Sequence, residues 1–586
     1  MIKLLNNFNK KDWLIVIFCF VLICLQVWLE LKMPDYMSEI TVLVQTEGSK
    51  MKDIIINGSY MLMCAMGSML ATIATGYLIA CLSAGFSRKI RKKLFDKVLN
   101  LSMEEVKKFK TSSLITRTTN DITQVEMLIG LGLLLMIKSP ITALWAIFKI
   151  YNKSWQWSAV TGIAVVILLS VVTCLVIIVV PRFKIVQRLT DKINDVTREN
   201  LTGIRVVRAF NASKYQEDKF NDVNNNLTNQ QLFNQKAFAI LSPIMYFVMH
   251  SLALSIYFIG SRLIDGAMLS DKLVIFGDMI VFSSYAMQII MSFLMLAFIF
   301  VMLPRANVSA KRINEVIDTD ISIVDGQVVN NKNKLKGVVE FKNVSFKYPD
   351  AEEYLLKNIS FKVNKGETVA FIGSTGSGKS TLINLVPRFY DATDGEILID
   401  GVNVKEYSQE SLHDKLGYVS QKAVIFSGTI KSNINYGKNR KRITDKKIKE
   451  AVKVAQAKDF VEKMDNKYDT HIAQGGTNIS GGQKQRLAIA RAIARDPEIY
   501  IFDDSFSALD YKTDSVLRRE LKKYTKDATS LIVAQRIGTI MNADKIIVLD
   551  NGECVGMGTH KELLASCEVY KQIALSQLKE EELYNE

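Results

Sequence analysis

The sequence has few cysteines, and none of them lies at a spacing that binds metal ions. Its seven cysteines among 586 residues fall mostly inside apolar runs, which indicates small packing residues. Low-complexity tracts and short internal repeats are missing as well. The first apolar stretch does not end in a small-residue cleavage site, so we expect it to remain in the protein as a membrane span and not as a signal peptide.

Long apolar runs fill the first half of the chain, although hydrophobic residues make up only 49% of the whole. About 20 apolar residues are needed to cross a bilayer as a helix. Six runs reach that length: 13–33, 58–86, 127–150, 157–181, 237–260 and 273–303. Each of them predicts a transmembrane helix.

Basic residues indicate how these spans are oriented. The net charge is +15, and Lys and Arg flank the apolar runs, so we assign the surplus to the membrane surface and expect no nucleic-acid partner. The long connections after the second and fourth spans are basic, whereas the short connections are not. The positive-inside rule then predicts an integral membrane protein with both termini in the cytoplasm and residues 34–57 outside.

Charged and polar side chains inside the spans are candidates for substrate contact, because burying them in lipid is costly. Lys138, His250 and Asp278 are the candidates, and Lys149 lies near one end of the third span. Lys138 and Lys149 could instead extend toward the membrane surface. The sequence does not choose between these alternatives.

A phosphate-binding loop stands out in the second half. The apolar strand 368–372 precedes it, and a helical pattern follows. In such a P-loop the backbone N–H groups face phosphates, Lys379 reaches the β- and γ-phosphates, and Ser380 binds magnesium. The predicted ATP-binding residues here are Gly373, Ser374, Thr375, Gly376, Ser377, Gly378, Lys379, Ser380 and Thr381.

A second apolar strand, 499–502, ends in Asp503, which suits a Walker B aspartate that holds Mg²⁺. Between the two strands, residues 480–483 read Ser-Gly-Gly-Gln. This segment resembles the signature of ATP-binding cassette (ABC) proteins, and the resemblance extends over essentially the whole chain. Six spans ahead of one cassette are similar to an ABC exporter half-transporter of the type IV fold. The implied fold class is an α-helical six-span domain followed by an α/β P-loop nucleotide-binding domain.

The resemblance also implies domain limits and residue roles. It implies an interfacial elbow helix over 1–12, the six-helix domain over 13–310, a linker over 311–336, the cassette over 337–575 and a tail over 576–586. Tyr348 would stack on adenine, and Gln421 would contact magnesium and sense the membrane domain. The signature residues Ser480, Gly481, Gly482 and Gln483, with Asp510 of the D-loop, would act on the ATP of a partner cassette. Residues 106–113 and 205–212 would contact the cassettes.

Two positions depart from the family pattern. Asp504 stands where the family usually has a glutamate that polarises the attacking water, and Gln535 stands in place of a switch histidine. Because the aspartate carboxylate is about 1.5 Å further back, and Gln cannot become a cation, we expect this site to bind ATP and hydrolyse it slowly. Gln474 and Gly475 replace a charged pair that usually meets the coupling helices.

These departures are similar to the degenerate-site subunit of bacterial heterodimeric multidrug exporters. The resemblance implies that the chain is an integral protein of a bacterial cytoplasmic membrane. The predicted function is ATP-driven export of hydrophobic or amphipathic molecules, with ATP and Mg²⁺ as cofactors and a homologous half-transporter and membrane lipids as partners. Two alternatives stay open. One is a homodimeric lipid or peptide exporter with slow hydrolysis, and the other is an ATP-sensing regulatory membrane protein that does not pump.

Overall fold

The computed structural model describes residues 1–46, 48–151, 154–329, 335–438 and 442–578. The chain forms two compact units. The first contains residues 1–99 and 110–319, and the second contains residues 100–109 together with the chain from Asp320 onward. A short segment of the connection after the second span therefore belongs to the second unit.

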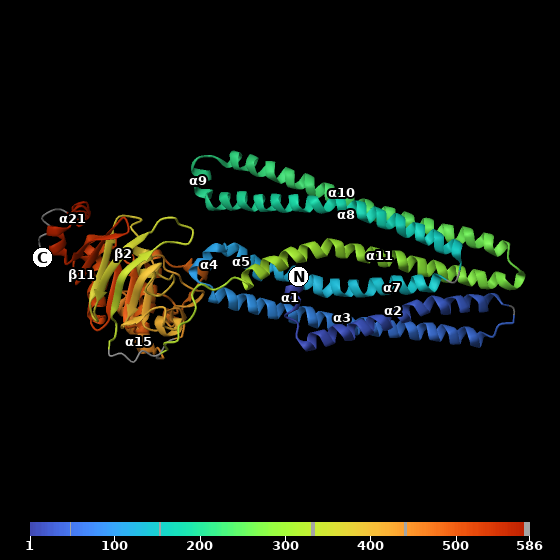
Figure 1. The fold of residues 1–586 in the computed structure, drawn as a ribbon, viewed down its shortest axis with the longest axis horizontal. Coiled ribbons are helices and arrows are strands. Elements are labelled where there is room, and N and C mark those ends of the chain that lie inside the picture. The colour runs from blue at the N-terminus through green and yellow to red at the C-terminus, as the bar shows by residue number, and fades with distance from the viewer. Residues whose placement is uncertain (47, 152–153, 330–334, 439–441, 579–586) are drawn as a thin grey trace. The chain divides into compact units, whose positions relative to one another are not determined.

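The first unit is helical (Figure 1). Its elements are α1 (Ile2–Leu5), α2 (Lys10–Gln45), α3 (Met51–Asn100), α5 (Thr111–Thr118), α6 (Asn120–Met127), the π-turn η1 (Leu128–Gly132), α7 (Leu133–Tyr151), α8 (Trp155–Thr202), α9 (Ile204–Ala209), α10 (Ser213–Asp265) and α11 (Leu269–Ile317). Six helices in the described residues are long and apolar enough to cross a membrane. The six predicted spans are therefore confirmed.

A loop over the whole of 34–57 is wrong, whereas the location of these residues outside the membrane stays a prediction. Helix α2 continues through Pro34 to Gln45, and α3 begins at Met51. A proline inside a helix removes one backbone hydrogen bond. The Tyr285 hydroxyl group of α11 lies 2.7 Å from the Leu31 carbonyl oxygen and 2.6 Å from the Asp35 carboxylate, and can donate its proton to either. Packing against α11 thus supports the helix where hydropathy predicted its end.

Two groups of helices build the first unit. α8 packs along α10, with α9 joining them at one end, while α11 packs against α2 and α7 (Figure 1). A buried cluster connects the groups: the Trp157 indole N–H donates to the Ile256 carbonyl oxygen at 3.1 Å, and its ring lies 5.3 Å from that of Phe282. α11 continues to Ile317, past residue 311, where the linker was expected to begin.

The second unit contains α4 (Met103–Lys108) and the cassette. An antiparallel sheet has the order β2-β1-β4-β5, from Leu356–Val363, Val339–Phe346, Asp394–Ile399 and Val402–Asn403. A six-stranded sheet has the order β12-β11-β3-β10-β9-β6, from Glu553–Gly558, Lys545–Asp550, Thr368–Gly373, Thr529–Val533, Ile499–Asp503 and Leu416–Val419. All its neighbours are parallel except β11 and β12. The short strands β7 (Gly428–Thr429) and β8 (His471–Ile472) pair separately.

The cassette helices that matter for the site are α12 (Lys379–Asn384), α17 (Gly481–Arg495) and α18 (Tyr511–Tyr524). The others are α13 (Gln409–His413), α14 (Ile430–Ile434), α15 (Asp445–Val454), α16 (Lys458–Glu462), η2 (Lys467–Asp469), η3 (Gln474–Gly476), α19 (Ile537–Ile540), α20 (His560–Ser566) and α21 (Glu568–Leu575). The predicted tail continues beyond Leu578, outside the described residues.

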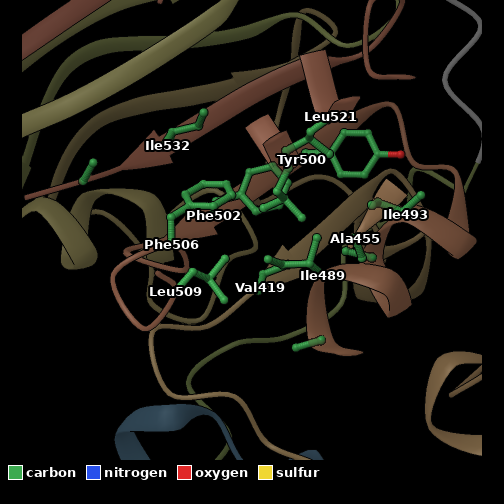
Figure 2. Packing of buried hydrophobic residues seen from close by; sticks show 14 of the residues in the cluster. Val419, Ala455, Ile489, Ile493, Tyr500, Phe502, Phe506, Leu509, Leu521 and Ile532 are labelled. Atoms are coloured by element: carbon green, nitrogen blue, oxygen red, sulfur yellow. The ribbon is translucent and has the colours of Figure 1, made fainter. Parts of the chain in front are cut away.

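A dense apolar core fixes the six-stranded sheet. Figure 2 shows Tyr500 and Phe502 of β9 packed with Ile489 of α17 and Leu521 of α18. These side chains are at most 4% exposed. Burying a side chain of this size stabilises the fold by about 1.5–3 kcal/mol. The core therefore holds the signature helix α17 against the strand that ends in Asp503.

Candidate functional site

Three predicted catalytic segments meet at the carboxyl edge of the parallel sheet. β10 lies between β3 and β9, with Val533 paired to both Phe371 and Asp503. The P-loop follows β3, the two aspartates end β9, and Gln535 comes two residues after β10. Because parallel strands end at the same edge of a sheet, residues far apart in the sequence become neighbours there.

The P-loop backbone adopts conformations that favour glycine. Gly376 and Gly378 have φ values of 87° and 92°, and a Cβ at Gly378 would lie 2.6 Å from Cδ2 of Leu356. Lys379 Nζ donates to the carbonyl oxygens of Gly373 at 2.9 Å and Ser374 at 2.6 Å. Burial lowers the pKa of Lys379, although the nearby aspartates oppose this. The ammonium is thus held inside the loop where phosphates would bind.

The magnesium candidates also converge. Ser380 Oγ donates to Asp503 Oδ1 at 2.7 Å, and burial raises the pKa of the Asp503 carboxyl. Hydroxyl, carboxylate and amide oxygens are ligands that suit Mg²⁺. Beside them, the hydroxyl groups of Tyr348 and Thr381 lie 3.0 Å apart, so the predicted adenine platform is tied to the start of α12.

Asp504 is the centre of a small hydrogen-bond network. Its Oδ2 accepts from Nε2 of Gln535 at 2.8 Å and from Nε2 of Gln421 at 3.2 Å. Asp504 is 6% exposed, and this burial raises the pKa of its carboxyl group. Its φ of 44° is in the left-handed region, which is uncommon for a residue other than glycine. Two departures from the family pattern, 31 residues apart, are thus in direct contact.

The predicted signature residues form a separate group. Ser480 caps α17: its Oγ accepts from the Gln483 N–H at 3.3 Å, and Gln483 Oε1 accepts from the Ser480 N–H at 2.9 Å. No atom would crowd a Cβ at Gly481, and one at Gly482 would lie 3.3 Å from the Ala508 carbonyl oxygen. Asp510 caps α18 by accepting from the Thr513 N–H at 2.9 Å. Within the described residues, no hydrogen bond joins this group to the P-loop.

Sequence reasoning missed Lys107 of α4. Its Nζ lies 4.9 Å from the ring centroid of Tyr348 and 5.2 Å from that of Tyr390, a cation–π arrangement. The sequence placed Lys107 only within the segment 106–113 that was expected to contact the cassettes, and nothing in it connected this lysine with Tyr348. Gln474 and Gly475 lie in η3, where Gly475 has a φ of 66°.

The intramembrane candidates lie on different helices. Lys138 of α7 is paired with Glu30 of α2 at 3.0 Å. Sequence reasoning did not single out Glu30. Lys149 is paired with Asp35 at 2.7 Å. His250 stacks on Tyr246 of its own helix α10, and Asp278 lies on α11.

Comparison with known proteins places this geometry in a family. Residues 16–293 match the ABC transporter transmembrane region, and residues 356–507 match the ABC transporter. An uncharacterized ABC transporter ATP-binding protein of Mycobacterium tuberculosis is 38% identical over 524 residues, covering 89% of this chain and 88% of its own. The uncharacterized ABC transporter ATP-binding protein YfiB of Bacillus subtilis is 34% identical, with 90% of each chain covered.

Two further similarities are informative. An ATP-dependent lipid A-core flippase of Pseudoalteromonas translucida is 31% identical over 513 residues, 86% of each chain. A solved structure of a bacterial Atm1-family ABC exporter with ATP bound has the same fold, with a TM-score of 0.80 and 23% identity over 96% of this chain and 97% of its own. The chain therefore belongs to the ABC transporter family, as an exporter half-transporter with six membrane spans followed by an ABC ATPase domain.

Proposed function

We propose that this exporter subunit binds Mg-ATP at its own P-loop but hydrolyses it slowly, and that its signature completes the ATP site of a non-identical partner. The observation that supports this proposal most directly is the hydrogen bond between Asp504 and Gln535. It brings both catalytic substitutions into one place, so that a single step of the reaction is affected while the phosphate-binding residues are kept.

Slow hydrolysis follows from what these two side chains can do. Gln535 donates an amide N–H to Asp504, and an amide neither takes up a proton nor becomes a cation near pH 7. Oδ2 of Asp504 already accepts two amide donors, so a water molecule must compete for this oxygen. Catalysis is sensitive to displacements of about 1 Å, which can reduce the rate about 100-fold.

We expect the site to keep its ability to bind ATP. Lys379 and the P-loop glycines are kept for the phosphates, and Ser380, Asp503 and Gln421 would hold Mg²⁺. When bound there, Mg²⁺ would supply positive charge that neutralises the phosphates. These residues would position the nucleotide between this P-loop and a signature supplied by the other cassette.

ABC half-transporters work as dimers, and we propose that the partner carries Glu and His at the positions equivalent to Asp504 and Gln535. Ser480 to Gln483, with Asp510, would then complete that partner's competent site. ATP binding would close the cassettes, whose motion would shift the helices from inward-facing to outward-facing. Both termini would be cytoplasmic, and the cargo would be hydrophobic or amphipathic.

The test begins with the tagged full chain, isolated from its native membrane so that any companion subunit is recovered. ATPase activity is then measured in lipid for the chain alone, for the assembled complex, and for the variant with Asp504→Glu and Gln535→His. We expect little activity from the chain alone, activity from the complex, and a partial gain from the double variant. Lys379→Ala is the control that should abolish nucleotide binding.

Vigorous hydrolysis by the chain alone, unchanged in the double variant, would replace this proposal with a homodimer. The similarity to lipid A-core flippases favours a lipid exporter as the second candidate. An ATP sensor that does not pump is distinguished by a third result, in which the assembled complex changes shape with ATP but moves no cargo.

A further inference from the structure

A polar cluster lies between α2, α3 and α7 in the membrane unit, apart from the nucleotide residues. Its centre is the ion pair of Glu30 and Lys138 at 3.0 Å. Lys138 is 13 residues before Tyr151, the end of α7, or about 20 Å along the helix. Lys138 is also near the middle of the apolar run 127–150, and about 20 such residues cross the bilayer, so the ion pair belongs to the predicted span.

One carboxylate oxygen of Glu30 accepts hydrogen bonds from the other three side chains of the cluster. Its Oε1 accepts from Lys138 Nζ, from Gln26 Nε2 at 2.8 Å and from Ser68 Oγ at 3.3 Å. Gln26 is 2% exposed, and its own Oε1 has no hydrogen-bond partner among the described residues. A buried carbonyl oxygen without a donor is unfavourable by about 1–3 kcal/mol. The cluster therefore has an unused acceptor beside its charged pair.

The two charged side chains are also incompletely covered. The side chains of Glu30 and Lys138 are 25% and 32% exposed. Charged groups within a bilayer face a protein interior or a water-filled cavity and not the lipid chains. This requirement would be met if the open side of the pair faced the interior of the assembled transporter, where cargo passes if the exporter function holds.

We infer that Glu30, Lys138, Gln26 and Ser68 form a recognition site for a zwitterionic amphipath, whose polar end carries an ammonium and an anionic group. This deepens the proposed export function and rests on it. The ammonium binds the exposed part of the Glu30 carboxylate, which Gln26 and Ser68 hold in place, while the anionic group binds the remaining N–H donors of Lys138. A ligand with a single charge would add an uncompensated charge to this neutral pair inside the membrane, which is costly.

A second ion pair on the same two helices supplies a matched control. Asp35 and Lys149 also join α2 to α7, at 2.7 Å, and Asp35 accepts from Tyr285. Lys149 lies two residues before the end of α7. If Glu30 and Lys138 only hold the helices together, neutralising either lysine should have the same effect on transport.

The experiment uses the assembled full-length transporter in phosphatidylglycerol vesicles, so that no bulk lipid carries an ammonium, and follows ATP-dependent movement of phosphatidylethanolamine that is fluorescently labelled on an acyl chain. Phosphatidylglycerol and diacylglycerol with the same label are the anionic and neutral comparisons. Lysophosphatidylethanolamine, added from the water, tests whether the same headgroup also stimulates ATPase activity when it does not come from the bilayer. The variants are Glu30→Gln, Lys138→Met, the charge swap Glu30→Lys with Lys138→Glu, and Lys149→Met.

We expect movement of the zwitterionic lipid, or stimulation by its lysolipid, to exceed the anionic and neutral probes. Glu30→Gln and Lys138→Met should raise the half-maximal concentration of the preferred probe at least 10-fold, and Lys149→Met less than twofold. The charge swap should not restore the wild-type value.

Equal handling of all three headgroups would overturn the ligand class. Restoration by the charge swap, or an equal loss in Lys149→Met, would show a helix clamp and overturn the recognition site. An assembled complex that hydrolyses ATP but moves no probe, and that no lysolipid stimulates, also overturns the site while leaving the ATPase intact. Absence of ATPase activity in the complex instead contradicts the proposed function itself.

Discussion

Lys107 offers a direct test of how α4 contacts the nucleotide site. Its ammonium lies 4.9 Å from the ring of Tyr348, the proposed adenine platform. A cation–π contact at an exposed site is worth about 0.5–1 kcal/mol, which corresponds to a two- to fivefold change in an equilibrium. Lys107→Met keeps most of the apolar stem and removes the charge. We expect ATP to bind about two- to fivefold more weakly, because the ring is no longer held in place.

The assay is the Kd of trinitrophenyl-ATP for the full chain, measured by fluorescence in a double-mutant cycle with Tyr348→Leu. Tyr348→Leu alone should cost about 1–3 kcal/mol, the usual value of base stacking on an aromatic ring. In the Tyr348→Leu background, Lys107→Met should have no further effect on Kd. Lys108→Met, on the same helix in the wild-type background, is the control and should leave Kd unchanged. Additive effects within about 0.3 kcal/mol would refute the coupling. Tighter binding by Lys107→Met would mean that the ammonium covers the face that adenine needs.

Two further predictions concern the second unit. Burial alone would raise the pKa of Glu105, but hydrogen bonds from Ser102 and Ser322 outweigh it and lower that pKa. This stabilisation should be present above about pH 4.5 and lost as pH falls below it. Protection factors of the α4 amides, which correct for the pH dependence of intrinsic hydrogen exchange, should fall in this range in the wild type but not in Glu105→Gln. Lys415 pairs with the fully buried Asp400 at 2.6 Å, so Lys415→Met should reduce the free energy of unfolding by about 3–5 kcal/mol and lower the melting temperature. Removal of an exposed lysine should change the free energy of unfolding by less than about 1 kcal/mol. Equal melting temperatures for these two variants would contradict the value given for Lys415→Met.

The sequence predicted those features that depend on contiguous residues. Apolar length alone predicted six spans, because crossing a bilayer requires a fixed number of buried residues. The P-loop could be recognised because the glycines that permit its backbone conformation and the lysine inside it are neighbours in the chain. The end of α2 was missed for the corresponding reason: Pro34 and Asp35 indicate a helix end locally, whereas Tyr285, 250 residues later, supports the helix there.

By itself the sequence determined the family resemblance, the order of the domains and the unusual residues Asp504 and Gln535. Only the tertiary structure decided that these two side chains share a hydrogen bond, that Lys107 lies over Tyr348 and that Lys138 pairs with Glu30. Each of these contacts joins residues 31 to 241 positions apart. Composition and periodicity describe the environment of a residue along its own helix or strand, whereas partners across elements follow from sheet order and helix packing.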